Sequence, residues 1–284
     1  MLLALCCPLL GQAPAPPNPV QTPPPAQASS WPTSQFTATA AKDPSVQKAK
    51  QILDIMIQAL GGQAYLSVRD MTSEGRSYSF WQGRPSGMGV VFWRFWEWPD
   101  KERVELTKQR DVVELYVGDK GYEITYKGTA TQDRKQLDGY LRRRAHSLET
   151  VIRSWLLATG TMILYSGTAI VERNLADEIT ILNAENDTVT IAVDPYSHLP
   201  SRLTFSYRDP VDRQKDDEAE IFSNYRQVQG INTPFSTVRT ENGEMRSQRF
   251  MTNVTYNTGL AATLFETKGI TYNPQKSGAS TPQQ

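Results

Sequence analysis

The strongest constraint on this fold is a change in the period of its apolar residues near Gly61-Gly62. Before that point apolar side chains recur every three or four residues, which predicts an amphipathic helix from Asp43-Pro44 to Leu60. Asp43 can cap the helix and Pro44 suits its first turn. From Met71 onward apolar and polar residues largely alternate, as in strands. The sequence therefore predicts one leading helix followed by a mostly β body.

Alternating segments separated by turn residues run through most of the remaining chain. Gly118-Asp119-Lys120-Gly121 and Asn242-Gly243 are typical hairpin turns, which favour antiparallel neighbours. About eleven or twelve strands result, and an antiparallel sheet of that size tends to curl. The predicted strands are 71–81, 88–98, 103–108, 111–117, 122–126, 162–171, 178–182, 188–193, 202–207, 219–228, 231–239 and 247–256.

A second amphipathic helix is predicted within residues 134–158, where Leu148, Val151, Ile152 and Trp155 share a stripe. The triplet Arg142-Arg143-Arg144 falls mostly on its other side. It could contact anionic lipid head groups or an acidic partner, or simply form a solvated face. Since 30 Lys+Arg balance 30 Asp+Glu in the whole chain, we favour the solvated face.

The N-terminal 41 residues contain no charge and nine of the 18 prolines, so we expect them to lie outside the fold. A short apolar run, Leu2 to Leu10, predicts a signal peptide over 1–15 and is too short to span a membrane. A tether over 16–42 follows, then a folded domain over 43–268 and a polar, disordered tail over 269–284. Lipid anchoring through Cys6 is an alternative to simple export. We expect a periplasmic or cell-envelope protein.

Catalytic and metal-binding signatures are missing from the sequence. Both cysteines lie in the leader, and His146 and His198 alone cannot make a zinc site. There is no phosphate-binding loop and no nucleophile elbow. The acidic run Asp216-Asp217-Glu218 has no calcium-loop spacing, so we interpret it as a solvated hairpin tip. We expect no catalytic residue, metal or cofactor, and the balanced charge argues against nucleic-acid binding.

The most aromatic predicted strand, 88–98, is the best candidate for a ligand site. Phe92, Trp96 and Trp98 share one face with Arg94, whereas Val91, Trp93 and Phe95 share the other. Apolar residues on both faces mean that both are covered, either as ordinary core or as a concave surface that accepts acyl chains. Which face is concave stays open, because a one-residue change of register exchanges them. The candidate ligand-binding residues are Phe92, Trp96, Trp98, Trp93 and Phe95.

Several segments, in the same order along the chain, resemble the LolA-like superfamily of periplasmic lipoprotein carriers. Trp96 to Glu105 is similar to its strand-Pro-turn-strand, and the Gly118-to-Tyr122 hairpin to its "DGK-x-W" motif. Further similar segments are Ala59 to Gly62, Val193 to Pro200, Phe222 to Ile231 with Pro234, and Asn253 with Leu264-Phe265. The resemblance covers residues 43–265.

The resemblance implies a curved, incomplete antiparallel β-barrel with amphipathic helices over an apolar concave face. It further implies a protein that binds acyl chains of lipoproteins or other lipids, or senses them. We expect an exported, non-enzymatic monomer. One position departs from the pattern: Trp98 stands where the carriers have an Arg before the Pro, so a lid locked by that Arg is not expected. The alternatives are a non-catalytic envelope interaction or sensor module without a lipid load and, third, a carboxylate hydrolase, for which no site is found.

Overall fold

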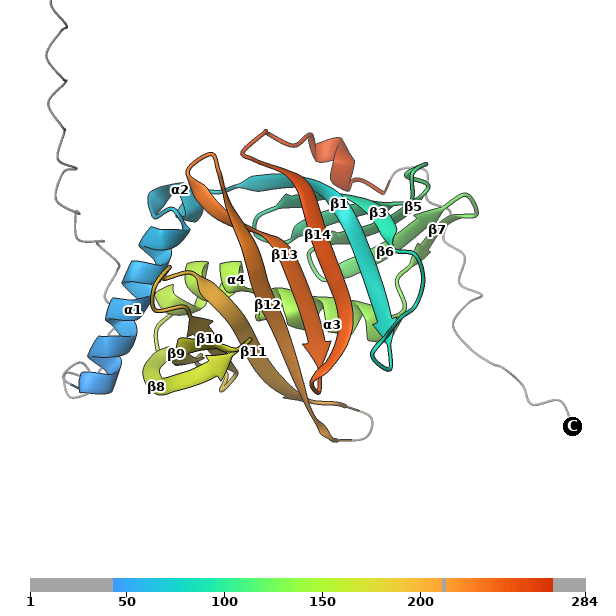
Figure 1. The fold of residues 1–284 in the computed structure, drawn as a ribbon. Helices are drawn as coiled ribbons and strands as arrows, with labels where there is room; N and C mark the ends of the chain where they lie inside the picture. The colour runs from blue at the N-terminus through green and yellow to red at the C-terminus, as the bar shows by residue number, and fades with distance from the viewer. Residues whose placement is uncertain (1–42, 211–212, 268–284) are drawn as a thin grey trace, which may run out of the picture. The chain divides into compact units, whose positions relative to one another are not determined.

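The computed structural model describes residues 43–210 and 213–267, shown in Figure 1. The predicted signal peptide, tether and tail, and Cys6, lie outside the described residues. None of the described helices is long and apolar enough to cross a bilayer.

Helix α1 (Pro44–Leu60) confirms the predicted leading helix at both ends. The Ser45 amide donates to the Asp43 carboxylate at 2.8 Å, and Gly61, with φ 131°, follows the last turn. One apolar stripe of the helix is buried, which is the reason for the three- and four-residue spacing. A short helix, α2 (Gln63–Leu66), comes directly after it.

The described residues form fourteen strands in one antiparallel sheet, ordered β7-β6-β5-β4-β3-β1-β14-β13-β12-β11-β10-β9-β8, with β2 beside β1. The sheet curves around the helices of residues 134–153 (Figure 1). It does not close, because β7 and β8 remain as separate edges. The predicted curved, incomplete barrel is therefore confirmed. The strands are β1 (Asp70–Trp81), β2 (Arg84–Pro85), β3 (Val90–Glu97), β4 (Lys101–Leu106), β5 (Val112–Val117), β6 (Lys120–Thr125), β7 (Gly128–Thr131), β8 (Met162–Val171), β9 (Asn174–Leu182), β10 (Thr188–Val193), β11 (Pro200–Arg208), β12 (Lys215–Val228), β13 (Ile231–Glu241) and β14 (Glu244–Tyr256).

The predicted strand count was too low by two short strands. β2 has two residues and β7 has four, so neither is long enough to show an alternating pattern. The single helix predicted within 134–158 was also wrong. It is divided into α3 (Arg134–Ala145), α4 (Leu148–Arg153) and a 3₁₀ turn, η2 (Trp155–Leu157). The Ser147 hydroxyl accepts from the Thr150 amide at 3.3 Å and starts a new helix there.

The main apolar core lies between α1, α4 and the inner side of the sheet. Its fully buried members include Met56 and Ile57 of α1, Val151 and Ile152 of α4, and side chains from β9 to β11. Burial of each such side chain stabilises the fold by roughly 1.5–3 kcal/mol. The two helices are thus the apolar cover of the concave face.

The last strand, β14, pairs with the first, β1, in the middle of the sheet. Beyond the ladder, the Asp70 carboxylate accepts from the amides of Thr258 and Gly259 at 2.7 and 3.0 Å. The ladder shifts register between Glu74 and Gly75, a bulge at which a Cβ on Gly75 would overlap the carbonyl oxygen of Phe250. This junction needs glycine.

Replacing Gly75 with Ala should lower the free energy of unfolding by about 3 kcal/mol, since the new methyl group forces the two central strands apart. The shift of the urea midpoint measures the loss. Gly87→Ala is the matched control, because no atom lies within 4 Å of its added Cβ. Equal midpoints for the two variants would contradict the close approach at Gly75.

Candidate binding site on the concave face

The register of the central strands shows which face of β3 is concave. Trp96 lies opposite Met71 of β1 and belongs to the same apolar cluster as Val151 and Ile152 of α4. Phe92, Trp96 and the partly buried Trp98 therefore face the covering helices. The structure brings these three predicted residues together on the concave side.

Trp93 and Phe95 lie on the convex face, away from the helices. The Trp93 indole N–H donates to the Glu74 carboxylate at 3.0 Å. The guanidinium of Arg110 lies 4.8 Å from the centre of the Trp93 ring and 5.7 Å from that of Phe95. These two aromatic rings therefore form a separate, partly polar cluster on the outside of the sheet.

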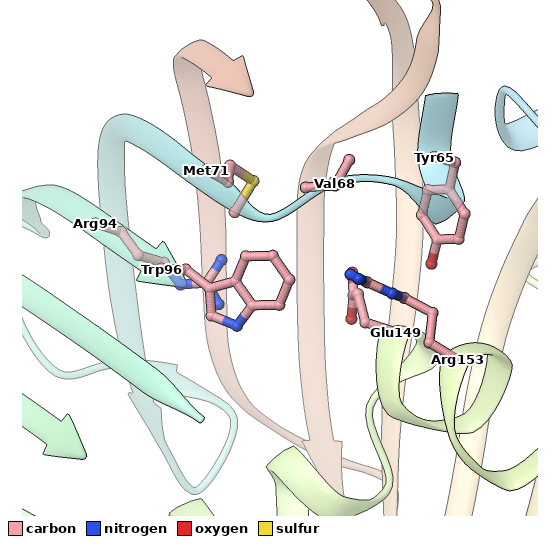
Figure 2. A pocket seen from close by; sticks show the side chains of 7 residues that line it. All are labelled: Tyr65, Val68, Met71, Arg94, Trp96, Glu149 and Arg153. Atoms are coloured by element: carbon pink, nitrogen blue, oxygen red, sulfur yellow. The ribbon is translucent and has the colours of Figure 1, made fainter. Parts of the chain in front are cut away.

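A small cavity opens where α2, α4, β1 and β3 meet. Figure 2 shows Trp96 and Met71 on one side of it and Tyr65, Glu149 and Arg153 on the other. Its volume is about 40 Å³, whereas ligand pockets usually exceed roughly 300 Å³. A larger ligand would fit here only if α4 moves away from the sheet.

Two hydroxyl groups on this side of the sheet have no hydrogen-bond partner among the described residues. Tyr65 is 9% exposed and Ser73 is 5% exposed. Burial raises the pKa of Tyr65 well above its ordinary value, so its hydroxyl keeps its proton as a donor. Ser73 lies directly opposite Arg94 across the β1–β3 ladder. Both groups are available to a polar ligand atom.

Beyond the apolar cluster, the concave face under α3 is lined with charges. The Arg94 guanidinium makes two bonds to the Glu102 carboxylate, at 2.7 and 3.2 Å, and the Tyr140 hydroxyl donates to it at 3.1 Å. Burial opposes ionisation of Glu102, but the charge and hydrogen bond of Arg94 outweigh it and lower its pKa. This pair ties β3 and β4 to α3.

The arginine triplet of α3 also points toward the sheet. Arg142 and Arg143 lie 3.6 and 3.9 Å from the Glu218 carboxylate, and Arg144 donates to the carbonyl oxygens of Asp100 and Gly118. The expected solvated helix face is therefore wrong. The expectation of a solvated hairpin tip is also wrong for Glu218. This residue is 5% exposed, and its carboxylate lies beside the guanidinium groups of Arg142 and Arg143.

Four more charged side chains share this inner face: Glu114 of β5, Glu220 of β12, Arg239 of β13 and Arg249 of β14. Glu220 lies opposite Arg239, and the Arg249 guanidinium lies 5.1 Å from the centre of the Phe92 ring. Burial raises the pKa of Glu114, and the charge of Glu102 raises it further. The interior therefore has an apolar part under α1 and α4 and a charged part under α3.

No sequence pattern predicted this charged part of the interior. Charged residues at every second position of a strand ordinarily indicate the solvent face. The one available signal was that Arg94 shares a face with Phe92 and Trp96, which placed a charge among the candidate ligand residues.

Glu114→Gln should raise the urea midpoint at pH 8 and leave it close to that of the wild type at pH 4. The pKa of the Glu114 carboxyl is raised in the native state above its ordinary value of 4.5. The neutral carboxyl therefore contributes fully to stability at a pH below 4.5, and this contribution is lost as the pH rises through the native pKa. Glu185→Gln, in the exposed turn after β9, is the control and should change neither midpoint. A gain from Glu114→Gln that is equal at both pH values would refute the assignment.

Comparison with known proteins gives matches at the level of structure alone. No family model matches the chain, and a search of curated proteins finds no match. A DUF1329 family protein from Desulfovibrio piger is 14% identical, with a TM-score of 0.53 over 77% of this chain and 97% of that one. This likeness shows a shared fold.

Two further solved structures are similar to this chain with lower TM-scores. A putative outer membrane lipoprotein-sorting protein domain from Vibrio parahaemolyticus is 9% identical, with a TM-score of 0.49 over 78% of this chain and 97% of its own. A LolA superfamily protein from Nitrosomonas europaea is 10% identical, with a TM-score of 0.46 over 77% and 97%.

Proposed function

We propose that this protein is an exported, non-catalytic carrier that holds the acyl chains of a lipid or lipoprotein in the apolar part of its half-barrel. The observation that carries the proposal is the cover of the concave face, which consists of α1 and α4 rather than a second sheet. Helices at the open side of a curved sheet can move without breaking any strand pairing. The apolar leader and the Pro-rich segment after it support export.

The apolar surface that an acyl chain would bury can be compared with the surface that displacement of α4 would expose. Burying twelve methylene groups contributes roughly 10 kcal/mol, at about 0.8 kcal/mol each. Displacing α4 exposes Leu148, Val151 and Ile152, which costs about 6 kcal/mol at roughly 2 kcal/mol per side chain. The difference, about 4 kcal/mol before the entropic cost of association is subtracted, is small, so binding would be reversible.

The contacts of α3 also suit a movable cover. Of its twelve residues, all of which the structure describes, only Gly139 is buried. Its contacts include charged hydrogen bonds and the stacked rings of Tyr116 and Tyr140, at 3.6 Å between centroids. Water can replace such hydrogen bonds when the helix leaves the sheet, so opening exposes little apolar area here.

A second candidate function is an envelope interaction or sensor module with no lipid load. The specific observation in its favour is the small volume of the cavity beside Trp96, about 40 Å³. In that case the aromatic face is ordinary core and the partner is another envelope protein. The two functions differ in whether an acyl chain can displace α4 from the sheet.

Addition of 1-dodecanol should increase amide hydrogen exchange in residues 148–157, because an entering chain displaces α4. Exchange in β12 and β13 should stay unchanged, since their pairing does not depend on that helix. Hydrogen exchange measured by mass spectrometry, with calorimetry for binding, tests both statements. Absence of binding together with unchanged exchange would favour the interaction module.

Trp96→Phe and Trp93→Phe form a matched pair on the two faces of β3. The concave substitution removes contact area with the chain and should weaken dodecanol binding about five-fold, which corresponds to roughly 1 kcal/mol. The convex substitution should leave the dissociation constant unchanged. Equal effects on binding would remove the concave face of β3 from the site.

A further inference from the structure

Two arginines on the concave face have no counter-charge within ion-pair distance. Arg239 and Arg249 lie on the adjacent strands β13 and β14, where Arg249 is opposite Thr237 and Arg239 is opposite Ser247. They are therefore diagonal neighbours on one face. No carboxylate oxygen of the residues that the structure describes lies within 4.0 Å of either guanidinium.

The nearby carboxylates are paired with other arginines or lie beyond ion-pair distance of these two guanidinium groups. Glu102 is held by Arg94 and Tyr140, and Glu218 is shared between Arg142 and Arg143. Burial raises the pKa of both Glu114 and Glu220, which favours their neutral forms. The charged part of the interior therefore has more arginines (Arg94, Arg142, Arg143, Arg144, Arg239 and Arg249) than glutamates (Glu102, Glu114, Glu218 and Glu220).

Partly buried guanidinium groups without partners are costly unless something compensates them. Burial lowers the pKa of Arg249, and the charge of Arg94 lowers it further, as that of Arg143 does for Arg239. An anion placed between these strands would relieve that repulsion. Guanidinium forks match the two oxygens of a carboxylate or phosphate.

The arginines also lie next to the apolar part of the interior. Arg249 lies 5.1 Å from the centre of the Phe92 ring, and Phe92 shares its strand face with Trp96 in the core cluster. Along the same face, the buried Ser73 hydroxyl has no hydrogen-bond partner among the described residues. A chain lying along Trp96 would thus bring its polar end toward the arginines.

We propose that Arg239 and Arg249 bind the anionic head group, a carboxylate or phosphate, of an amphiphile whose chain occupies the apolar part. This inference rests on the proposed function and names the class of its ligand. It assigns head-group selection to β13 and β14 and chain binding to β3 and α4.

Laurate and 1-dodecanol, which share a chain of twelve carbons and differ in head-group charge, are the probes. Their dissociation constants are measured by calorimetry at pH 8 for the wild type, the Arg239→Gln/Arg249→Gln double variant and Arg76→Gln. Arg76, exposed on the convex face of β1, is the control. Urea unfolding checks that each variant folds.

The wild type should bind laurate at least ten-fold more tightly than dodecanol. The double variant should bind both with the affinity that the wild type has for dodecanol, and Arg76→Gln should behave as the wild type. Dodecyl phosphate should follow laurate, whereas inorganic phosphate should not compete at millimolar concentration.

Three results would overturn the assignment while leaving chain binding intact: equal affinities for laurate and dodecanol in the wild type, an equal loss for both in the double variant, or a preference for laurate that the double variant retains. Competition by inorganic phosphate near the dissociation constant of laurate would show a site for free anions and would also overturn it. If neither probe binds, the proposed function itself fails, and this inference fails with it.

Discussion

A sheet that curls without closing has one face that water would reach unless something covers it, and the rest of this structure depends on that constraint. The strands run from edge β7 to edge β8 without a second sheet opposite them. Helices α1 and α4 supply the missing apolar layer, and α3 continues it with polar contacts. A cover made of helices is the part of such a fold that can move while every strand pair is kept.

The interior of the half-barrel consists of an apolar part and a charged part. Under α1 and α4 it resembles a protein core, where Met56, Ile152 and Ile191 are almost completely buried. Under α3 it is a row of guanidinium and carboxylate groups, several of which keep some contact with water, as the 20% exposure of the Arg94 side chain shows. An amphiphile has the same division along its length. This match in polarity, more than the present cavity volume, is the reason we propose an amphiphile as the occupant.

The architecture could be predicted from the sequence because its signals are local. The start of α1 is set by Asp43 and Pro44 and its end by Gly61, and the twelve longer strands show alternation over enough residues to be found. The break between α3 and α4 could not be predicted from the apolar stripe, which continues across it. It depends on one serine cap and on the position of the sheet beneath.

The charged part of the site escaped prediction for a different reason. Glu218, Glu220 and Arg239 alternate with other residues as a solvent-facing row would, and nothing local marks them as inward. Their orientation is fixed by neighbours on other strands, such as Phe205 opposite Glu218 and Leu203 opposite Glu220. Phe92, Trp96 and Trp98 could be predicted as candidate site residues because aromatic side chains on a strand indicate a covered face, whichever side of the sheet they are on. Their assignment to the concave side needed the register.

The place of β14 has a consequence for how the chain acquires its structure. The last strand in the sequence is not an edge strand but lies between β1 and β13, and the Asp70 carboxylate binds the backbone just beyond it. A nascent chain that lacks residues 244–256 has two separate sheets and no continuous concave surface. Its central pairing closes a loop of nearly the whole domain, which makes folding slow and concentrates it after synthesis of the final strand.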